Sequence, residues 1–517
     1  MKPKHRKSGR PIRLLPAMLT LLSAMAVAAY LILPGMWQWA HAEAQVEARK
    51  AHQVDTVPGP VEPELVERLR AIGTTTQAAP VIITYHDIGH NKSPYTVTPE
   101  NFATQMRLIH DAGWTTLTGN QLSDWLGGKP LPPRSVMITF DDGALGVWQY
   151  ADPVLKRFDQ HASAFIITGF VGTNAPYYMT WGQIEELRAS GRWDLEAHTH
   201  QGHVQIPSDD HGGKAPYLTT TQWLADQHRY ETPDEYHARV LGDLVECKRQ
   251  FALHGLPSPR FFAYPFSAHE DDPSATDNKL QQTVASLYRA AMLDDSDNVV
   301  ATSANDIARA EIQRMDITAN LSLADFSRKI DLASPEDPLA AQPLSDSAEW
   351  IDEHGAPIQL DISGPTITLN PPPGHEVVRS YAPIRATMWN DYTVTAEVGG
   401  LPLRPDETLA GISVLKPPNA EGQLPARVDV TVSANAYSVN ARDLITVPPQ
   451  TLAASPTHHL VVDVTDTQVS VSVDDAVPTV IDLPPHGAHM IGGGLSLYAL
   501  RQSDVSPSLT FTNVTIS

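Results

Sequence analysis

The sequence predicts an α/β domain with a mainly parallel sheet, open or closed as a barrel, followed by an all-β sandwich. Between residues 80 and 333, short apolar runs rich in β-branched residues alternate with helical segments. From residue 348 to 517, apolar and polar residues alternate with the period of a strand. The segment 334–347 carries Pro335, Pro338 and Pro343, and it is predicted to be the linker between the two parts.

Local signals place the elements of the first domain. Thr98-Pro99 is an N-cap followed by a proline suited to the first helical turn, and capping boxes begin at Thr180 and Thr232. Strands are expected at residues 81–86, 114–117, 136–142, 162–168, 193–198, 260–265, 289–293 and 311–317, and helices at 98–113, 121–126, 152–158, 180–191, 232–253, 279–287 and 322–330. Because parallel strands end at one rim of the sheet, site residues should gather there.

The second domain is predicted to be a two-sheet antiparallel sandwich. Its alternating runs are expected to form strands at residues 392–398, 427–432, 459–464, 468–473, 494–498 and 509–516.

The N-terminus is predicted to cross or leave a membrane. A basic segment, residues 1–13, precedes an apolar run at 14–37 that is long enough to span a bilayer. We expect a single-pass anchor with the rest of the chain outside the cytoplasm. Ala40-His41-Ala42 is an alternative cleavage site that would give a secreted protein. Residues 38–79 are expected to be a polar stalk with a short helix near 63–72.

Composition narrows the class of protein. The chain has 517 residues, 42% of them hydrophobic and 19% charged, which is typical of globular domains. A formal net charge of -22 argues against nucleic acid and anionic membrane surfaces as partners, and it is compatible with a neutral or cationic glycan. Cys247 is the only cysteine, so no intramolecular disulfide can form.

Two adjacent acids end the strand at residues 136–142. Asp141 and Asp142 repel each other and lose hydration at the end of a buried strand, so a positive group must offset that cost. A metal ion bound by one carboxylate would do so and leave the other free to move protons. The alternative is a strand that runs into an ordinary Asp-Gly turn.

A histidine-rich loop follows the strand at 193–198. His198 and His203, together with Asp142, would supply the three protein ligands that zinc hydrolases use. The alternative is a solvated loop. Arg260 begins a later strand that ends at Pro265, and His86 ends the first strand. Considered alone, these two could be an edge-strand arginine and a structural histidine.

Together these residues resemble the NodB-homology polysaccharide deacetylases, carbohydrate esterase family four. Thr139–Gly143 is similar to the family's first motif, His198-Thr199 with His203 to the second, and Arg260–Pro265 to the third. Histidines five positions apart resemble the poly-β-1,6-N-acetylglucosamine deacetylase branch. The same branch is indicated by Tyr85-His86-Asp87, by Arg229-Tyr230-Glu231 and by the helix carrying Glu235–Val240.

The resemblance covers about residues 80–320, within a (β/α) barrel-like deacetylase domain at 80–333, and it implies a role for each residue. Asp142, His198 and His203 would hold a divalent metal, expected to be zinc with other divalent transition metals open. Asp141 would be the general base and His86 the acid, with Arg260 orienting Asp141. The backbone N–H of Phe266, beside Tyr264 and Pro265, would stabilise the oxyanion.

Two departures from the family's pattern lie at the same site. Pro265-Phe266-Ser267 stands where the family often has Pro-Tyr-Gly, so the flexible glycine is missing. His200 adds a third imidazole that could compete for the metal.

Residues 348–517 resemble concanavalin A-like jelly-roll modules in the pattern of runs such as Leu460–Val464 and Gly493–Tyr498. By analogy, carbohydrate binding is the expected role. Trp389, Tyr392 and Tyr437 could stack on sugars, or each could equally belong to the core. A structural spacer is the alternative role.

The expected function is metal-dependent de-N-acetylation of an extracellular β-linked N-acetylglucosamine polysaccharide. Peptidoglycan or chitin is the alternative substrate. A non-catalytic glycan-binding surface protein is the alternative of another class. The expected partners are this polysaccharide and, through the N-terminal helix, a membrane.

Overall fold

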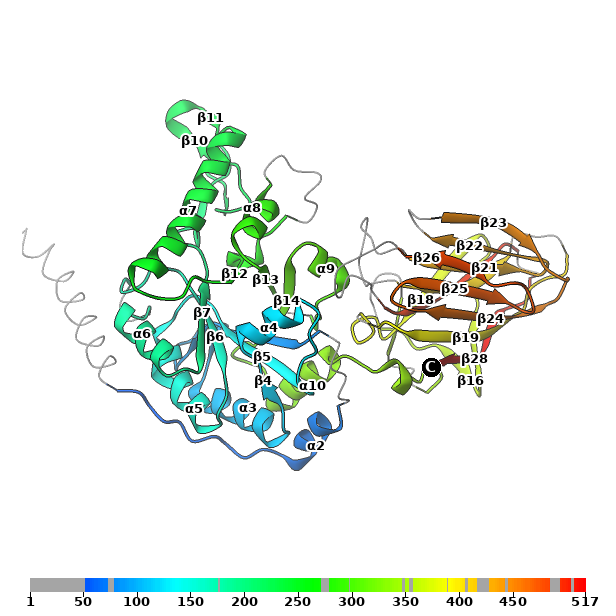
Figure 1. Ribbon diagram of the computed structural model, residues 1–517, viewed down its shortest axis with the longest axis horizontal. Helices are drawn as coiled ribbons and strands as arrows, with labels where there is room; N and C mark the ends of the chain where they lie inside the picture. Colours follow the sequence, from blue (N-terminus) through cyan, green and yellow to red (C-terminus); the bar gives the residue numbers. More distant parts are fainter. Residues whose placement is uncertain are drawn as a thin grey trace, which may run out of the picture.

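The computed structural model describes residues 52–72, 79–174, 177–270, 279–296, 298–345, 349–352, 357–387, 389–404, 408–415, 427–441, 445–483, 493–503 and 506–517. An α/β part built on parallel strands is followed by a part built from antiparallel sheets (Figure 1). Both fold classes are those that the sequence predicts.

The predicted membrane anchor at residues 14–37 lies outside the described residues. Within the described ranges, no helix combines the length and the apolar character needed to cross a membrane.

The parallel strands of the first part close into a barrel. Their order around it is β1, β14, β13, β12, β7, β6 and β5, and β5 pairs back onto β1, so that Val81 lies beside Val136 and Tyr85 beside Phe140. The short strand β4 (Thr115–Thr116) extends the sheet from β5. The barrel strands are β1 (Val81–Tyr85), β5 (Ser135–Phe140), β6 (Ala162–Ile166), β7 (Trp193–Ala197), β12 (Phe261–Ala263), β13 (Ala290–Asp295) and β14 (Glu311–Asp316).

Helices surround the barrel (Figure 1). The predicted caps form: the side chains of Thr98, Thr180 and Thr232 each accept a hydrogen bond from the backbone N–H three residues on. The short helix α9 was not expected from the sequence. The helices are α3 (Pro99–Asp111), α4 (Gly119–Trp125), α5 (Asp152–Arg157), α6 (Trp181–Ala189), α7 (Pro233–Leu253), α8 (Leu280–Leu287), α9 (Ala304–Ala308) and α10 (Leu323–Ala333).

Two apolar layers hold the barrel together. Alternate residues of a strand face opposite sides, so Met137 packs in a cluster with Phe165 and Trp125, whereas Ile138 packs with residues of the surrounding helices. Strands buried on both faces read as continuous apolar runs, which is why the strands of this domain could be predicted.

Residues 52–72, predicted to be part of a stalk, instead lie along the barrel. The Val54 N–H donates to the Gln149 carbonyl at 2.8 Å, and Leu65 and Leu69 of α2 (Pro63–Ala71) are buried in the outer apolar layer. The short helix predicted near residues 63–72 is present as α2, but the expected stalk packs on the barrel here, because α2 has an apolar face that the barrel covers.

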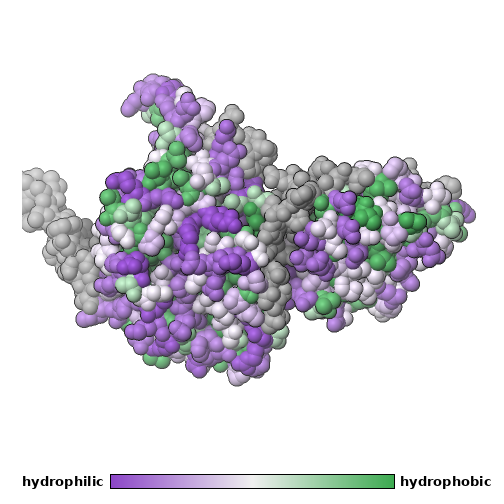
Figure 2. Space-filling view, viewed as in Figure 1, coloured by the Kyte–Doolittle hydropathy of each residue, from purple (hydrophilic) through white to green (hydrophobic). Residues whose placement is uncertain are grey.

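In the described part of the domain, six short strands pair two by two outside the barrel sheet. An arm projects from the start of α7 and ends in the hairpin of β10 and β11 (Figure 1). Hydrophilic residues dominate the tip of this arm (Figure 2), as expected for a solvated projection. These strands are β2 (Asp87–Ile88), β3 (Thr96–Val97), β8 (Gln205–Pro207), β9 (Lys214–Pro216), β10 (Trp223–Leu224) and β11 (Arg229–Tyr230).

The second part is a sandwich of two antiparallel sheets. In the described ranges one sheet has the order β15 (Trp350–Ile351), β18 (His375–Tyr381), β27 (Leu495–Arg501), β20 (Leu409–Val414), β21 (Val428–Ser433), β22 (Ala436–Ala441) and β23 (Ile445–Thr451). The other has the order β16 (Asp361–Ser363), β17 (Thr366–Leu369), β28 (Leu509–Ile516), β19 (Tyr392–Gly399), β24 (Thr457–Val464), β25 (Gln468–Val473) and β26 (Thr479–Asp482). One apolar cluster contains residues of both sheets.

The aromatics proposed to stack on sugars belong to that core. Trp389, Tyr392 and Tyr437 are 3%, 1% and 4% exposed. The Tyr392 hydroxyl donates to the Gly494 carbonyl, and the Trp389 indole N–H donates to the Glu336 carbonyl. Stacking on sugars is therefore excluded for these three, and the alternative that they belong to the core is confirmed, because all three rings are buried.

Trp389→Ala should destabilise the sandwich by about 3–5 kcal/mol, the usual cost of removing a buried tryptophan. Calorimetry of the full chain should show a lower unfolding temperature for the transition of this domain. Val477→Ala is the matched control because Val477 is 86% exposed and should leave that temperature unchanged. An unchanged transition for Trp389→Ala would contradict its place in the core.

Candidate metal centre and active site

Asp142, His198 and His203 meet at the carboxyl rim of the barrel. Asp142 lies just beyond β5, His198 directly follows β7, and His203 lies five residues further along the loop. The Nε2 atoms of His198 and His203 lie 3.6 and 3.4 Å from the same oxygen, Asp142 Oδ1. One ligand atom from each residue falls within 4.8 Å of the others, so the structure brings together the three residues that the sequence singled out.

The geometry of these three residues fits a divalent cation. Among the described residues, Asp142 Oδ1 is buried and has no hydrogen-bond partner. His198 Nδ1 lies 2.8 Å from the Ala263 carbonyl, so the tautomer protonated at Nδ1 leaves the Nε2 lone pair facing Asp142. One carboxylate and two imidazoles are a donor set that zinc accepts.

The local charges favour a cation at the same point. Burial raises the pKa of Asp142, but His198, His86 and His203 outweigh this and hold it well below its ordinary value. Burial lowers the pKa of His198, but Asp141 and Asp142 reverse the effect and raise it. Burial and the neighbouring His198 lower the pKa of His203 to about 4, so this imidazole is neutral at physiological pH. Asp142 and His203 are therefore in the ionised and neutral forms that a metal requires, whereas His198, whose pKa is raised, would release a proton on binding one.

His200 does not join the group. Its Nδ1 lies 3.0 Å from the Thr168 hydroxyl at the end of β6, and its backbone N–H donates to Asp243. The third imidazole therefore faces away from Asp142 and does not compete for the cation.

Asp141 is held by Arg314, which the sequence analysis missed. Two hydrogen bonds of 2.7 Å join the guanidinium of Arg314 to the two carboxylate oxygens of Asp141. Arg314 is fully buried, and its guanidinium lies 5.2 Å from the centre of the Phe165 ring in the barrel interior. Burial raises the pKa of Asp141, but Arg314, together with His198 and His86, outweighs burial and leaves the pKa below its ordinary value.

Arg260 does not orient Asp141, and that prediction is wrong. Arg260 precedes β12 and therefore lies at the amino end of the barrel, opposite the rim that carries Asp141. There it pairs with Asp194 at 3.2 Å and with Asn120. Arg314 could have been noticed as a charged residue in the middle of a predicted strand, where only a buried partner justifies it.

His86 directly follows β1, the strand that pairs with β5. Its Nδ1 is 3.8 Å from Asp316 Oδ1, and one atom each of His86, Asp294 and Asp316 fall within 4.8 Å of one another. Arg314 lies 3.6 Å from Asp294, so a guanidinium already supplies positive charge beside these carboxylates. This second group therefore suits proton transfer by His86 better than it suits a second metal.

The turn after β12 provides one exposed aromatic. Phe266 is 50% exposed, adopts φ 60°, and its ring lies 4.5 Å from that of His203. Tyr264 and Pro265 are buried, and the Tyr264 ring packs against Phe262 in the layer between barrel and helices. Tyr264 and Pro265 therefore support the turn that carries Phe266, and their expected part in the oxyanion or substrate site stays a prediction.

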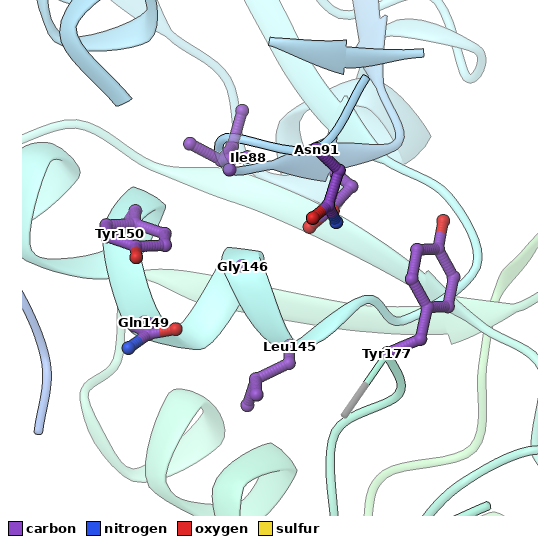
Figure 3. Close-up of a pocket in the computed structure, with 9 residues that line it drawn as sticks. Ile88, Asn91, Leu145, Gly146, Gln149, Tyr150 and Tyr177 are labelled. Atoms are coloured by element: carbon purple, nitrogen blue, oxygen red, sulfur yellow. The ribbon is translucent and has the colours of Figure 1, made fainter. Parts of the chain in front are cut away.

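Tyr177 is a further site residue that the sequence did not reveal. Its hydroxyl lies 3.5 Å from Asp142 Oδ2, and burial with the nearby Asp142 raises the tyrosine pKa far above its ordinary value. Tyr177 also lines a small pocket with Asp87, Asn91 and Gln149, and Figure 3 shows its ring upright at the edge of that pocket. The hydroxyl is therefore a neutral donor next to the cation site.

Comparison with known proteins agrees with this geometry. Residues 128–285 match the family model described as polysaccharide deacetylase. The poly-beta-1,6-N-acetyl-D-glucosamine N-deacetylase of Escherichia coli (strain K12) is 29% identical over 153 residues, which are 27% of this chain and 23% of that protein. The protein of the same name from Staphylococcus epidermidis is 27% identical over 210 residues, which are 40% of this chain and 65% of that protein. The chain thus spans less than two thirds of the length of these relatives.

Among solved structures, the BpsB deacetylase domain from Bordetella bronchiseptica aligns with 47% of this chain and 98% of its own, at 22% identity and a TM-score of 0.41.

We expect Zn²⁺ to stabilise the full chain by about 2.7 kcal/mol when present at about 100 times its dissociation constant, because it binds only the folded site. Asp142→Ala and His198→Ala should abolish this shift. His200→Ala is the matched control from the same loop and should keep it. Denaturant unfolding with and without Zn²⁺ measures the effect, and a shift that survives in Asp142→Ala would contradict the site.

Proposed function

Because the chain contains a polysaccharide deacetylase domain, an enzyme domain that acts on acetamido sugars, we propose that it removes acetyl groups from an extracellular β-linked N-acetylglucosamine polysaccharide. The observation that carries the proposal is the buried Asp141–Arg314 pair beside Asp142, His198 and His203. Asp141 can accept a proton, while the neighbouring Asp142 faces the imidazoles of His198 and His203.

We propose that Asp142, His198 and His203 hold a divalent cation, with zinc the first candidate from the donor set. When bound, this cation supplies Lewis acidity towards the acetamide carbonyl and lowers the pKa of water. Asp141 would act as the general base that accepts a proton from the attacking water. Arg314 keeps Asp141 ionised and fixes its orientation, and each carboxylate oxygen retains a lone pair for the incoming proton.

His86 donates a proton to the departing amine. It lies on β1's carboxyl end, next to the strand that carries Asp141, and Asp316 faces its ring. The Phe266 backbone N–H is our candidate for the oxyanion donor, because the left-handed turn at Phe266 lies against His203. The neutral hydroxyl of Tyr177 adds a donor on the Asp142 side.

A glycan-binding protein without catalysis is the alternative of another class. Binding a neutral sugar does not require a carboxylate that is buried, kept ionised by a guanidinium and left off the cation site. Peptidoglycan and chitin remain alternative substrates. Rates of amine release from β-1,6- and β-1,4-linked N-acetylglucosamine oligomers and from peptidoglycan would rank them.

Export is part of the proposal. We propose that residues 14–37 anchor the chain in a membrane, or are removed on secretion, so that the enzyme meets an extracellular polymer. We also retain glycan binding as a proposal for the sandwich, although Trp389, Tyr392 and Tyr437 are unavailable for it because they are buried.

Asp141→Asn should lower kcat for amine release from N-acetylglucosamine oligomers by about 10²–10⁴-fold, the usual contribution of a general base. Its affinity for Zn²⁺ should stay close to that of the wild type, because Asp141 is bonded to Arg314 and not to the cation. His198→Ala should lose both properties. Equal kcat for Asp141→Asn and wild type would rule out the mechanism, and a wild type inactive on every glycan would favour the binding protein.

Arg314→Ala should shift the acid limb of the kcat/KM profile to higher pH. Without the guanidinium, burial raises the pKa of Asp141, so a higher pH is needed to ionise it. Arg260→Ala is the matched control. It should keep the wild-type profile and cost about 1.5–3 kcal/mol of stability for its charged hydrogen bonds at the amino end. If Arg260→Ala shifts the acid limb to higher pH and Arg314→Ala does not, Arg260 orients Asp141, as the sequence predicted.

A further inference from the structure

The two histidines of the cation site are fixed in different ways. His198 continues directly from β7: its N–H donates to the Ile166 carbonyl at 3.1 Å, and its ring bonds the Ala263 carbonyl at 2.8 Å. His203 follows a loop of irregular backbone and is partly exposed. Its ring meets Asp142 and Phe266, so the position of this imidazole depends on the conformation of residues 199–202.

A carboxylate from α7 binds the backbone of that loop. Asp243 Oδ1 accepts the His200 N–H at 2.9 Å, and Asp243 Oδ2 accepts the Gln201 N–H at 2.7 Å. Asp243 is 9% exposed. Successive N–H groups that converge on one anion form a rigid turn, because each must point inward at the same time.

Gly202 shows how closely the carboxylate fits. A Cβ at Gly202 would lie 3.2 Å from Asp243 Oδ1 and 3.1 Å from the Thr199 Cγ2 methyl. A side chain at position 202 would be crowded against the Asp243 carboxylate and the Thr199 side chain. The residue just before His203 is thus packed directly against the group that orders the turn.

The barrel holds the opposite side of the same loop. Beyond β6, the Thr168 N–H donates to the Thr199 carbonyl at 3.1 Å, and the Gly169 N–H donates to the His200 carbonyl at 2.8 Å. Carbonyls of the loop therefore face the end of β6, while its N–H groups face α7. Asp243 is the side chain that completes this second attachment.

We propose that Asp243 is a positioning residue, which sets the distance of His203 from Asp142 and so tunes the affinity of the site for its cation. The inference rests on the proposed function only in assigning a cation to the site. It concerns how tightly the site binds, not which sugar the enzyme cleaves.

The test uses the full chain stripped of metal. Zn²⁺ affinity is measured by competition with a chromophoric chelator, at a temperature where circular dichroism shows every variant folded. Asp243→Ala should bind Zn²⁺ about 10–100-fold more weakly, the usual effect of removing a partner that orients a metal ligand. Asp243→Asn should lose less, because its amide oxygen can still accept one of the two N–H groups.

Glu246→Ala is the matched control, one turn further along α7. Glu246 pairs with Arg249 and Gln250 on its own helix, so its loss should leave Zn²⁺ affinity within about twofold of wild type. Excess Zn²⁺ should restore most of the kcat of Asp243→Ala, a rescue that a purely structural role would not give.

Wild-type Zn²⁺ affinity in Asp243→Ala would overturn the inference and leave the proposed function untouched. If Asp243→Ala does not fold, Asp243→Asn and Gly202→Ala decide the question: weaker Zn²⁺ binding in both supports positioning, and unchanged binding in both overturns it. If the wild-type protein binds Zn²⁺ tightly but deacetylates no glycan, the proposed function is contradicted instead.

Discussion

The buried ion pair between Arg314 and Asp141 is the interaction on which the carboxyl rim depends. Taking both charges out of water costs several kcal/mol for each ion, and only good geometry and further contacts offset it. Here both carboxylate oxygens are bonded at 2.7 Å, the Thr139 hydroxyl lies 3.3 Å from the guanidinium, and the Phe165 ring lies below it. The pair therefore favours an ionised acid inside the barrel.

That arrangement divides the rim into two halves with different chemistry. On one side, His198 and His203 converge on Asp142 Oδ1, a buried oxygen with no hydrogen-bond partner among the described residues, and this group suits a cation. On the other side, His86 faces Asp316 and suits proton transfer. Asp142 adopts φ 69°, a left-handed backbone conformation just beyond the end of β5.

The sequence predicted the grouping of Asp142, His198 and His203, but it did not predict that Arg314 binds Asp141. Parallel strands end at one rim, so Asp142 and His198 could be brought together from their positions at two strand ends. Arg260 was misplaced because it starts its strand instead of ending it. Arg314 was missed because it lies on β14 and Asp141 lies just beyond β5, 173 positions apart in the sequence. Burial of Trp389 likewise follows from how two sheets pack, which alternation alone does not show.

The closure of the barrel has a consequence for biosynthesis. β1 carries His86 at its end and β14 carries Arg314, and these first and last strands of the barrel are neighbours, with Thr84 beside Asp316. A nascent chain that has emerged only as far as the second metal-ligand histidine possesses every cation ligand but lacks the guanidinium that keeps the base charged. The pairing of Asp141 with Arg314 therefore cannot form until residue 316 has been synthesised and β14 has paired with β1.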